Sequence, residues 1–326
     1  MEYTYLGRTG LKVSRMCLGT MNFGVNTSEK MSFRIMDAAL DNGLNFFDTA
    51  NIYGKIGGTE KIIGTWFNQG NHRREKVVLA TKVYGGPTVN WLTKPGDWPN
   101  TSKLSAKHII AACDDSLKRL KTDYIDLYQM HHIDRNTPWE EIWQAMELLV
   151  AQGKVLYIGS SNFAGWHIVR ANENAKKRNF MGLVSEQSLY NLTQRSVELE
   201  VLPACKEYGL GFIPWSPLAG GVLGGRAPNN KKSRRYQATD SYKAYGKKLE
   251  KYYSICDEYS VKPVTISLAW LLSNPIVTAP IIGPREVGQL EEPLKAIKYT
   301  IDQGLLEKLD TLWPGPGGQA PEAYAW

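Results

Sequence analysis

Short apolar segments of strand length alternate along the chain with longer segments in which apolar residues recur at helical spacing. The short segments are nearly continuous in hydrophobicity, which is typical of parallel strands covered on both faces. Eight of them lie at residues 16–19, 44–48, 77–82, 124–131, 155–159, 183–187, 211–215 and 279–283. Capping residues and glycines mark the helices between them. The clearest helices cover residues 28–42, 105–120, 138–152 and 194–208. Thr27 or Ser28 can cap the first helix, and Thr101, Ser102 or Ser105 the second. Gly209 ends the fourth.

This alternation predicts an α/β fold, a single (β/α)8 TIM barrel that forms one domain over residues 1–326. Residues 3–6 and 11–14 precede the first barrel strand and predict an N-terminal β-hairpin that plugs the bottom of the barrel. Two connections are longer than ordinary loops. They are residues 84–104, after the third barrel strand, and residues 216–240, after the seventh.

The composition is that of an ordinary globular protein and excludes several classes. Of the 326 residues, 43% are hydrophobic and 22% are charged. No segment approaches the run of about 18 apolar residues that a membrane helix needs. The first residues lack the basic and apolar regions of a secretory signal, and the four cysteines lie far apart. We therefore expect a cytoplasmic protein with reduced thiols and no membrane partner.

The net charge of +7 is concentrated in one segment. Residues 226–251 hold nine basic and two acidic residues, so they account for +7 and the rest of the chain nets zero. A basic segment can bind nucleic acid or an anionic ligand, or simply be solvated. No helix-turn-helix pattern or aromatic stacking platform accompanies it, so we expect no nucleic-acid partner. Our interpretation is a mobile lid over an anionic cofactor.

Polar side chains end three consecutive predicted strands. The second strand ends in Asp48, and Tyr53 follows five residues later. The third strand ends in Lys82, and the fourth ends in His131 and His132. Active sites of (β/α)8 barrels lie at the carboxyl ends of the strands, so we expect these side chains to meet. We identify no set of metal ligands among them.

An acid, an amine, a phenol and an imidazole in one place suit carbonyl reduction. Asp48 would keep Lys82 protonated, and the ammonium would lower the pKa of Tyr53. An imidazole beside them can orient a carbonyl oxygen by a hydrogen bond. A hydride that reaches the carbonyl carbon leaves an alkoxide, which Tyr53 can protonate.

Five segments of the chain resemble the aldo-keto reductases. They are residues 43–54, 80–82, 126–131, 159–163 and 214–218, in the order of that family. The resemblance implies that Asp48, Tyr53, Lys82 and His131 form the family's catalytic tetrad, and that His132 is not its histidine. The chain is most similar to the bacterial and potassium-channel-β-like branch. Some of its segments are also similar to NDP-hexose 2,3-enoyl reductases.

The resemblance also implies a cofactor, NADPH or NADP⁺, bound across the barrel mouth without a Rossmann fold. The residues that it assigns to the nicotinamide are Ser161, Asn162, Gln187 and Trp215. Those that it assigns to the pyrophosphate are Ser216, Leu218, Gly220, Gly221, Leu223 and Arg226. Those that it assigns to the adenosine end are Gly283, Arg285, Gln289 and Glu292. An arginine suits the 2′-phosphate because its planar fork is permanently charged. Pro293 stands where relatives often carry asparagine. Proline has no donor for the adenine, so the resemblance does not settle an adenine contact here.

We expect a small-molecule carbonyl substrate in a pocket walled by Phe23, Tyr53, Trp91 and the loop of residues 84–104, with Trp98 and Trp215 as further candidates. Trp91 and Trp98 could equally pack their loop onto the barrel. The leading hypothesis is an NADPH-dependent carbonyl reductase acting on an aldehyde, a ketone or a sugar derivative.

The alternative is a regulatory NADPH-binding protein similar to the channel β-subunits. The sequence also leaves open whether the chain forms a homo-oligomer. A Schiff-base aldolase using Lys82 is disfavoured because Asp48 would keep that amine protonated.

Overall fold

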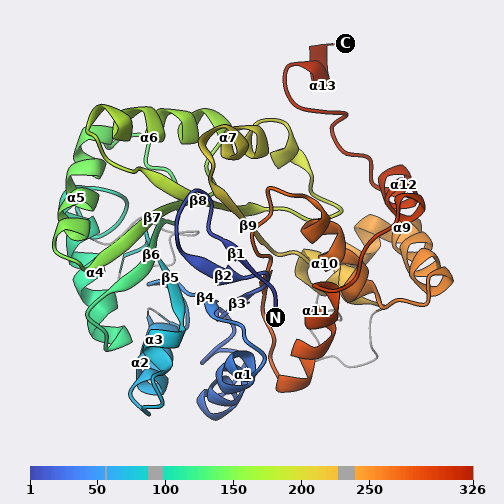
Figure 1. Cartoon of the computed structure of the whole chain (residues 1–326), viewed down its shortest axis with the longest axis horizontal. Coiled ribbons are helices and arrows are strands. Elements are labelled where there is room, and N and C mark those ends of the chain that lie inside the picture. Colours follow the sequence, from blue (N-terminus) through green and yellow to red (C-terminus); the bar gives the residue numbers. More distant parts are fainter. Residues whose placement is uncertain (56, 87–97, 227–238, 326) are drawn as a thin grey trace.

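The N-terminal hairpin closes one end of the barrel. The computed structural model describes residues 1–55, 57–86, 98–226 and 239–325. Strands β1 (Tyr3–Tyr5) and β2 (Lys12–Ser14) pair antiparallel, as predicted. Figure 1 shows this hairpin lying across the end of the barrel. Leu6 and Val13 of the hairpin are fully buried against side chains of the barrel interior, so the hairpin plugs that end.

In the described residues, eight parallel strands form the barrel and confirm the predicted fold (Figure 1). They are β3 (Cys17–Gly19), β4 (Phe46–Asp48), β5 (Val78–Val83), β6 (Ile125–Met130), β7 (Val155–Ser161), β8 (Leu183–Leu189), β9 (Gly211–Trp215) and β10 (Ile281–Ile282). Their order is β10-β3-β4-β5-β6-β7-β8-β9. β9 reaches the segment before β10 through the Thr278 N–H, which donates to the Phe212 carbonyl at 2.8 Å. The barrel is therefore nearly closed.

Helices surround the strands in the alternating order expected of this fold (Figure 1). They are α1 (Glu29–Asp41), α2 (Gly58–Phe67), α3 (Arg73–Lys76), α4 (Ala106–Leu120), α5 (Trp139–Ala151), α6 (Gly165–Lys177), α7 (Val201–Tyr208), α9 (Thr239–Glu258), α10 (Pro263–Ser273), α11 (Glu291–Ala296), α12 (Gln303–Leu312) and α13 (Glu322–Ala325). Short 3-10 turns are η1 (Ser196–Glu198), η2 (Ala219–Gly224) and η3 (Val287–Leu290). Ser28 and Ser105 cap α1 and α4 with their hydroxyls, as predicted.

The predicted start of the helix over residues 194–208 was wrong. The helix α7 begins at Val201, and Ser196–Glu198 forms a separate 3-10 turn. Pro203 lies in the first turn of α7, where its missing N–H breaks no helical bond. In a longer helix Pro203 would leave the Leu199 carbonyl without its partner. That carbonyl instead accepts a hydrogen bond from Ala320 N–H at 2.9 Å.

The two long connections follow β5 and β9, the third and seventh strands of the barrel. Residues 87–97 of the first and 227–238 of the second lie outside the described residues. Trp91 and most of the predicted lid therefore lie there too. Among the helices that the structure describes, none has the length and apolar character to cross a membrane.

Candidate active site

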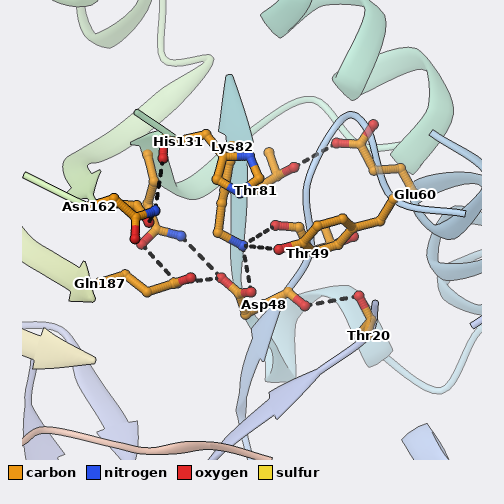
Figure 2. A network of polar contacts seen from close by, with 12 residues as sticks. Thr20, Asp48, Thr49, Glu60, Thr81, Lys82, His131, Asn162 and Gln187 are labelled. Atoms are coloured by element: carbon orange, nitrogen blue, oxygen red, sulfur yellow. Dashed lines mark hydrogen bonds and ion pairs between the residues drawn. The ribbon is translucent and has the colours of Figure 1, made fainter. Parts of the chain in front are cut away.

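Three predicted residues meet at the carboxyl ends of β4 and β5. The Lys82 side chain is fully buried and its Nζ donates three hydrogen bonds. These go to Asp48 Oδ1 at 2.6 Å, the Thr49 carbonyl at 2.8 Å and the Tyr53 hydroxyl at 3.3 Å. Figure 2 shows the lysine amine at the centre of this network. One ammonium thus joins the carboxylate to the phenol.

Two glutamines hold the other oxygen of Asp48. Its Oδ2 accepts from Gln187 Nε2 at 2.8 Å and from Gln129 Nε2 at 3.1 Å (Figure 2). Gln129 lies beside Lys82 in the register of β5 and β6. Gln129 was not predicted as a site residue, although it lies two residues after the buried Leu127, on the same face of β6. A polar residue at such an inward position of β6 was the available signal.

The electrostatics of Tyr53 differ from the prediction. Burial raises the pKa of Tyr53 above its ordinary value, and the Lys82 charge lowers it only in part. The predicted lowering by Lys82 is thus present, but desolvation, which was not considered, outweighs it and makes the net shift of the pKa upward. Burial would also lower the pKa of Lys82, but Asp48 and Tyr53 together raise it. At neutral pH the phenol is protonated and the amine is charged.

His131 lies next to Tyr53, with ring centroids 5.9 Å apart and ring planes at 81°. Burial, Lys82 and His132 lower the pKa of His131 well below its ordinary value, so the imidazole is neutral. His132 stacks on His131 and meets the edge of Tyr84. The ring of His131 therefore packs beside that of Tyr53.

Asn162 connects the tetrad to the predicted nicotinamide residues. Its backbone is left-handed, with φ of 59°. Its Nδ2 donates to the His131 carbonyl at 3.2 Å and to Ser161 Oγ at 2.9 Å. Its Oδ1 accepts from Trp215 Nε1 at 3.0 Å. Ser161, Asn162, Trp215 and Gln187 are thus brought together beside His131 and Asp48.

The predicted pyrophosphate residues follow β9 in a tight loop. Gly220 and Gly221 adopt φ of 71° and 107°, which an L-residue rarely does. A Cβ built on Gly220 meets no atom of the described residues within 4 Å, so this part of the structure leaves that side of the loop open. Leu218 and Ser216 are half-buried, whereas Leu223 is fully buried in the core.

Arg226 follows this loop and pairs with α9. Its guanidinium lies 3.2 Å from Asp257 and 3.8 Å from Glu250, over the ring of Tyr253. The basic residue predicted nearest the pyrophosphate therefore already has acidic partners.

The predicted adenosine-end residues lie between β10 and α11. The Arg285 N–H donates to Gln289 Oε1 at 2.8 Å, and Gly283 accepts from Asn22 Nδ2 at 3.0 Å. Burial would raise the pKa of Glu292, but hydrogen bonds from lysines and a threonine lower it. Its carboxylate is shared by Lys262, Thr265 and Lys295.

Of the predicted pocket walls, Tyr53 and Trp215 lie beside Lys82 and Asn162. Phe23 is fully buried in the core, so it has no surface on which a substrate could lie. Trp98 is 75% exposed, and Trp91 lies outside the described residues. Tyr84, the first residue of the predicted wall 84–104, and His132, the second residue after β6, are half-buried beside each other. His132 was not predicted as lining.

Comparison with known proteins identifies the family. The family model described as "Aldo/keto reductase family" matches residues 15–314. The chain belongs to the aldo/keto reductase family. This confirms the resemblance and the fold inferred from the sequence.

This aldo/keto reductase is similar to several curated proteins over nearly its whole length. It is 58% identical to the "Uncharacterized oxidoreductase YrpG" of Bacillus subtilis (strain 168), covering 100% of both chains. It is 36% identical to a "Probable voltage-gated potassium channel subunit beta" of Oryza sativa subsp. japonica, covering 91% of each. It is 32% identical to the "Versiconal hemiacetal acetate reductase" of Aspergillus parasiticus, covering 95% of this chain and 96% of the relative. The family and the names of the Bacillus and Aspergillus relatives support an oxidoreductase.

Proposed function

We propose that this aldo/keto reductase uses NADPH to reduce a carbonyl group of an aldehyde, a ketone or a sugar derivative to an alcohol. The observation that carries the proposal is the position of Lys82 Nζ, hydrogen-bonded to both Asp48 and Tyr53. An aldolase would need this amine neutral, whereas Asp48 and Tyr53 raise its pKa. The site therefore favours proton transfer by the phenol.

Each residue of the tetrad has one task in this proposal. Tyr53 is protonated at neutral pH and donates its hydroxyl proton to the developing alkoxide. Lys82 remains charged and stabilises the phenolate that Tyr53 becomes. Asp48 compensates the buried ammonium. The neutral His131 donates a hydrogen bond that orients the carbonyl oxygen.

The residues present fit NADPH, which supplies the hydride for the carbonyl carbon when it is bound. Trp215 offers a partly exposed ring for stacking, and Ser161 and Asn162 offer polar groups for a carboxamide. The open side of Gly220 allows a phosphate to approach the backbone. Arg285 offers a permanent charge for a 2′-phosphate.

The proposal is tested by NADPH consumption with a panel of aldehydes, ketones and sugar nucleotides, beginning with 4-nitrobenzaldehyde. Tyr53→Phe removes the proton donor and leaves the ring, so we expect a loss of kcat of at least about a hundredfold. NADPH binding, followed by fluorescence, should be unchanged. A variant with the wild-type rate would contradict the role of Tyr53.

A second candidate is a regulatory subunit that binds NADPH but reduces carbonyls little. It is favoured by relatives named as probable potassium channel β-subunits, at 36% and 34% identity. NADPH binding without turnover of any carbonyl in the panel would support this candidate over the reductase. Turnover that depends on Tyr53 would exclude it as the whole function.

A further inference from the structure

A buried carboxylate lies on the other side of β8 from the tetrad. Gln187 points into the barrel, where it binds Asp48. Because side chains alternate across a strand, Glu186 and Ser188 point to the outer face. Glu186 is fully buried there. None of the roles assigned above to the tetrad or the cofactor residues uses it.

The carboxylate of Glu186 binds both sides of the turn that carries Asn162. Its Oε1 accepts from Phe163 N–H at 3.1 Å and from Ser188 Oγ at 2.6 Å. Its Oε2 accepts a short hydrogen bond from Ser160 Oγ. Ser160 precedes Ser161–Asn162 and Phe163 follows it, so one carboxylate ties β7, the turn and β8 together.

The turn needs such support because its backbone is strained. Asn162 has a left-handed φ of 59°, which costs a non-glycine residue about 1 kcal/mol or more. Figure 2 shows Asn162 beside His131 and Gln187. Its amide also accepts the indole N–H of Trp215. A displaced turn would therefore move Asn162 and release Trp215 together.

We propose that Glu186 is a positioning residue, whose buried carboxylate holds Ser161 and Asn162 in the arrangement that binds the nicotinamide carboxamide. This inference rests on the proposed function, because the turn acts on a nicotinamide only if the chain binds NADPH. The ionised carboxylate accepts hydrogen bonds at both oxygens, whereas the protonated carboxyl must donate one. Protonation therefore weakens charge-assisted bonds that fix the turn.

The surroundings of Glu186 bring the pKa of its carboxyl close to neutral pH. Burial raises the pKa of Glu186 to about 7, although hydrogen bonds from Ser160, Ser188 and the backbone of the turn act to lower it. Burial also raises the pKa of the Cys205 thiol of α7, which therefore stays neutral. Burial, together with the charges of Arg135 and Arg170, lowers the pKa of His167 of α6 to about 4. On β9 the residue in register is the apolar Phe212.

The sign of the pH effect follows from these directions. Above pH 7 Glu186 is ionised and holds the turn, and below pH 7 it is neutral and the turn loosens. Affinity for the nicotinamide half should fall as pH falls from 8 to 6. The 2′-phosphate of the cofactor titrates near pH 6 as well, so a ligand with that phosphate but no nicotinamide is needed as the reference.

The experiment compares NADP⁺ with 2′-phospho-ADP-ribose by calorimetry between pH 6 and 8. For the wild type, we expect the preference for NADP⁺ over the fragment to increase about tenfold across this range. In Glu186→Gln, which keeps the size and one acceptor, the preference should stay low at every pH. Fragment binding should be unchanged in that variant.

Ser160→Ala is the second variant, in case Glu186→Gln does not fold. The Ser160 hydrogen bond lowers the pKa of Glu186, so its loss should raise the pH at which the preference changes. An unmoved midpoint would overturn the inference. So would a pH-dependent preference in Glu186→Gln, or equal loss of both ligands there. A wild type that binds neither ligand would overturn the proposed function, and this inference with it.

Discussion

At the scale of single residues, the site is organised around Asp48. One of its oxygens receives the Lys82 ammonium and the other receives Gln129 and Gln187. Lys82 and Tyr53 could be assigned from their strand ends. Gln129 was missed, although its place on the inward face of β6, inside the segment 126–131, was a readable signal. The net rise in the pKa of Tyr53 was beyond the sequence, since it depends on how completely the phenol is desolvated.

The Asp48–Lys82 ion pair should show strong coupling in a double-mutant cycle. Lys82→Met leaves a buried carboxylate without its cation, and we expect a loss of about 3–5 kcal/mol in the free energy of unfolding. Asp48→Asn should also lower the free energy of unfolding, because it leaves the buried Lys82 ammonium without its carboxylate. The double variant should lose clearly less than the sum of the two. Additivity in guanidinium unfolding would contradict a coupled pair.

Arg285 allows the cofactor preference to be tested by one substitution. Arg285→Ala removes a permanent cation, and we expect at least a tenfold weaker affinity for NADPH, a charge-assisted contact being worth about 1.5–3 kcal/mol. NADH lacks the 2′-phosphate, so its affinity should change little. Fluorescence titration with both cofactors measures the ratio. An equal loss for NADPH and NADH would remove Arg285 from phosphate recognition.

At the scale of elements, most helices and strands could be predicted from capping residues and from the patterns of apolar residues. The strand positions and the Ser28 and Ser105 caps follow from local sequence, which acts within a few residues. The start of α7 follows from it only in part, because Pro203 marks the first turn but the partner of the Leu199 carbonyl is Ala320 of the distant C-terminal segment. Contacts across such distances along the chain leave no local pattern to read.

The Ser105 cap gives an element-scale prediction with a matched control. Its Oγ accepts from His108 N–H at 3.3 Å at the start of α4. Ser105→Ala should lower the free energy of unfolding by about 1 kcal/mol, and Ser105→Gly by only a few tenths. Ser102→Ala lies before the helix and should change it little. Equal losses in the Ser102 and Ser105 alanine variants would mean that Ser105 is not the cap.

At the scale of the whole molecule, the barrel explains how residues far apart in sequence form one site. Asp48, Lys82, Gln129 and Gln187 come from four strands whose carboxyl ends share one face. The positive charge of residues 226–251 is not explained by the barrel. Arg226 shares its charge with Asp257 and Glu250, and residues 227–238 lie outside the described part of the chain. The lid over an anionic cofactor thus stays a prediction.

Hydride transfer to a carbonyl carbon is tested most directly by isotope transfer. The protein is incubated with NADPH carrying two deuterium atoms at the nicotinamide C4, together with 4-nitrobenzaldehyde, and the product is analysed by mass spectrometry. We predict 4-nitrobenzyl alcohol with one deuterium on carbon, formed by the wild type and not by Tyr53→Phe. Unlabelled alcohol, or no alcohol from any carbonyl in the panel while NADPH is bound, would contradict a carbonyl reductase.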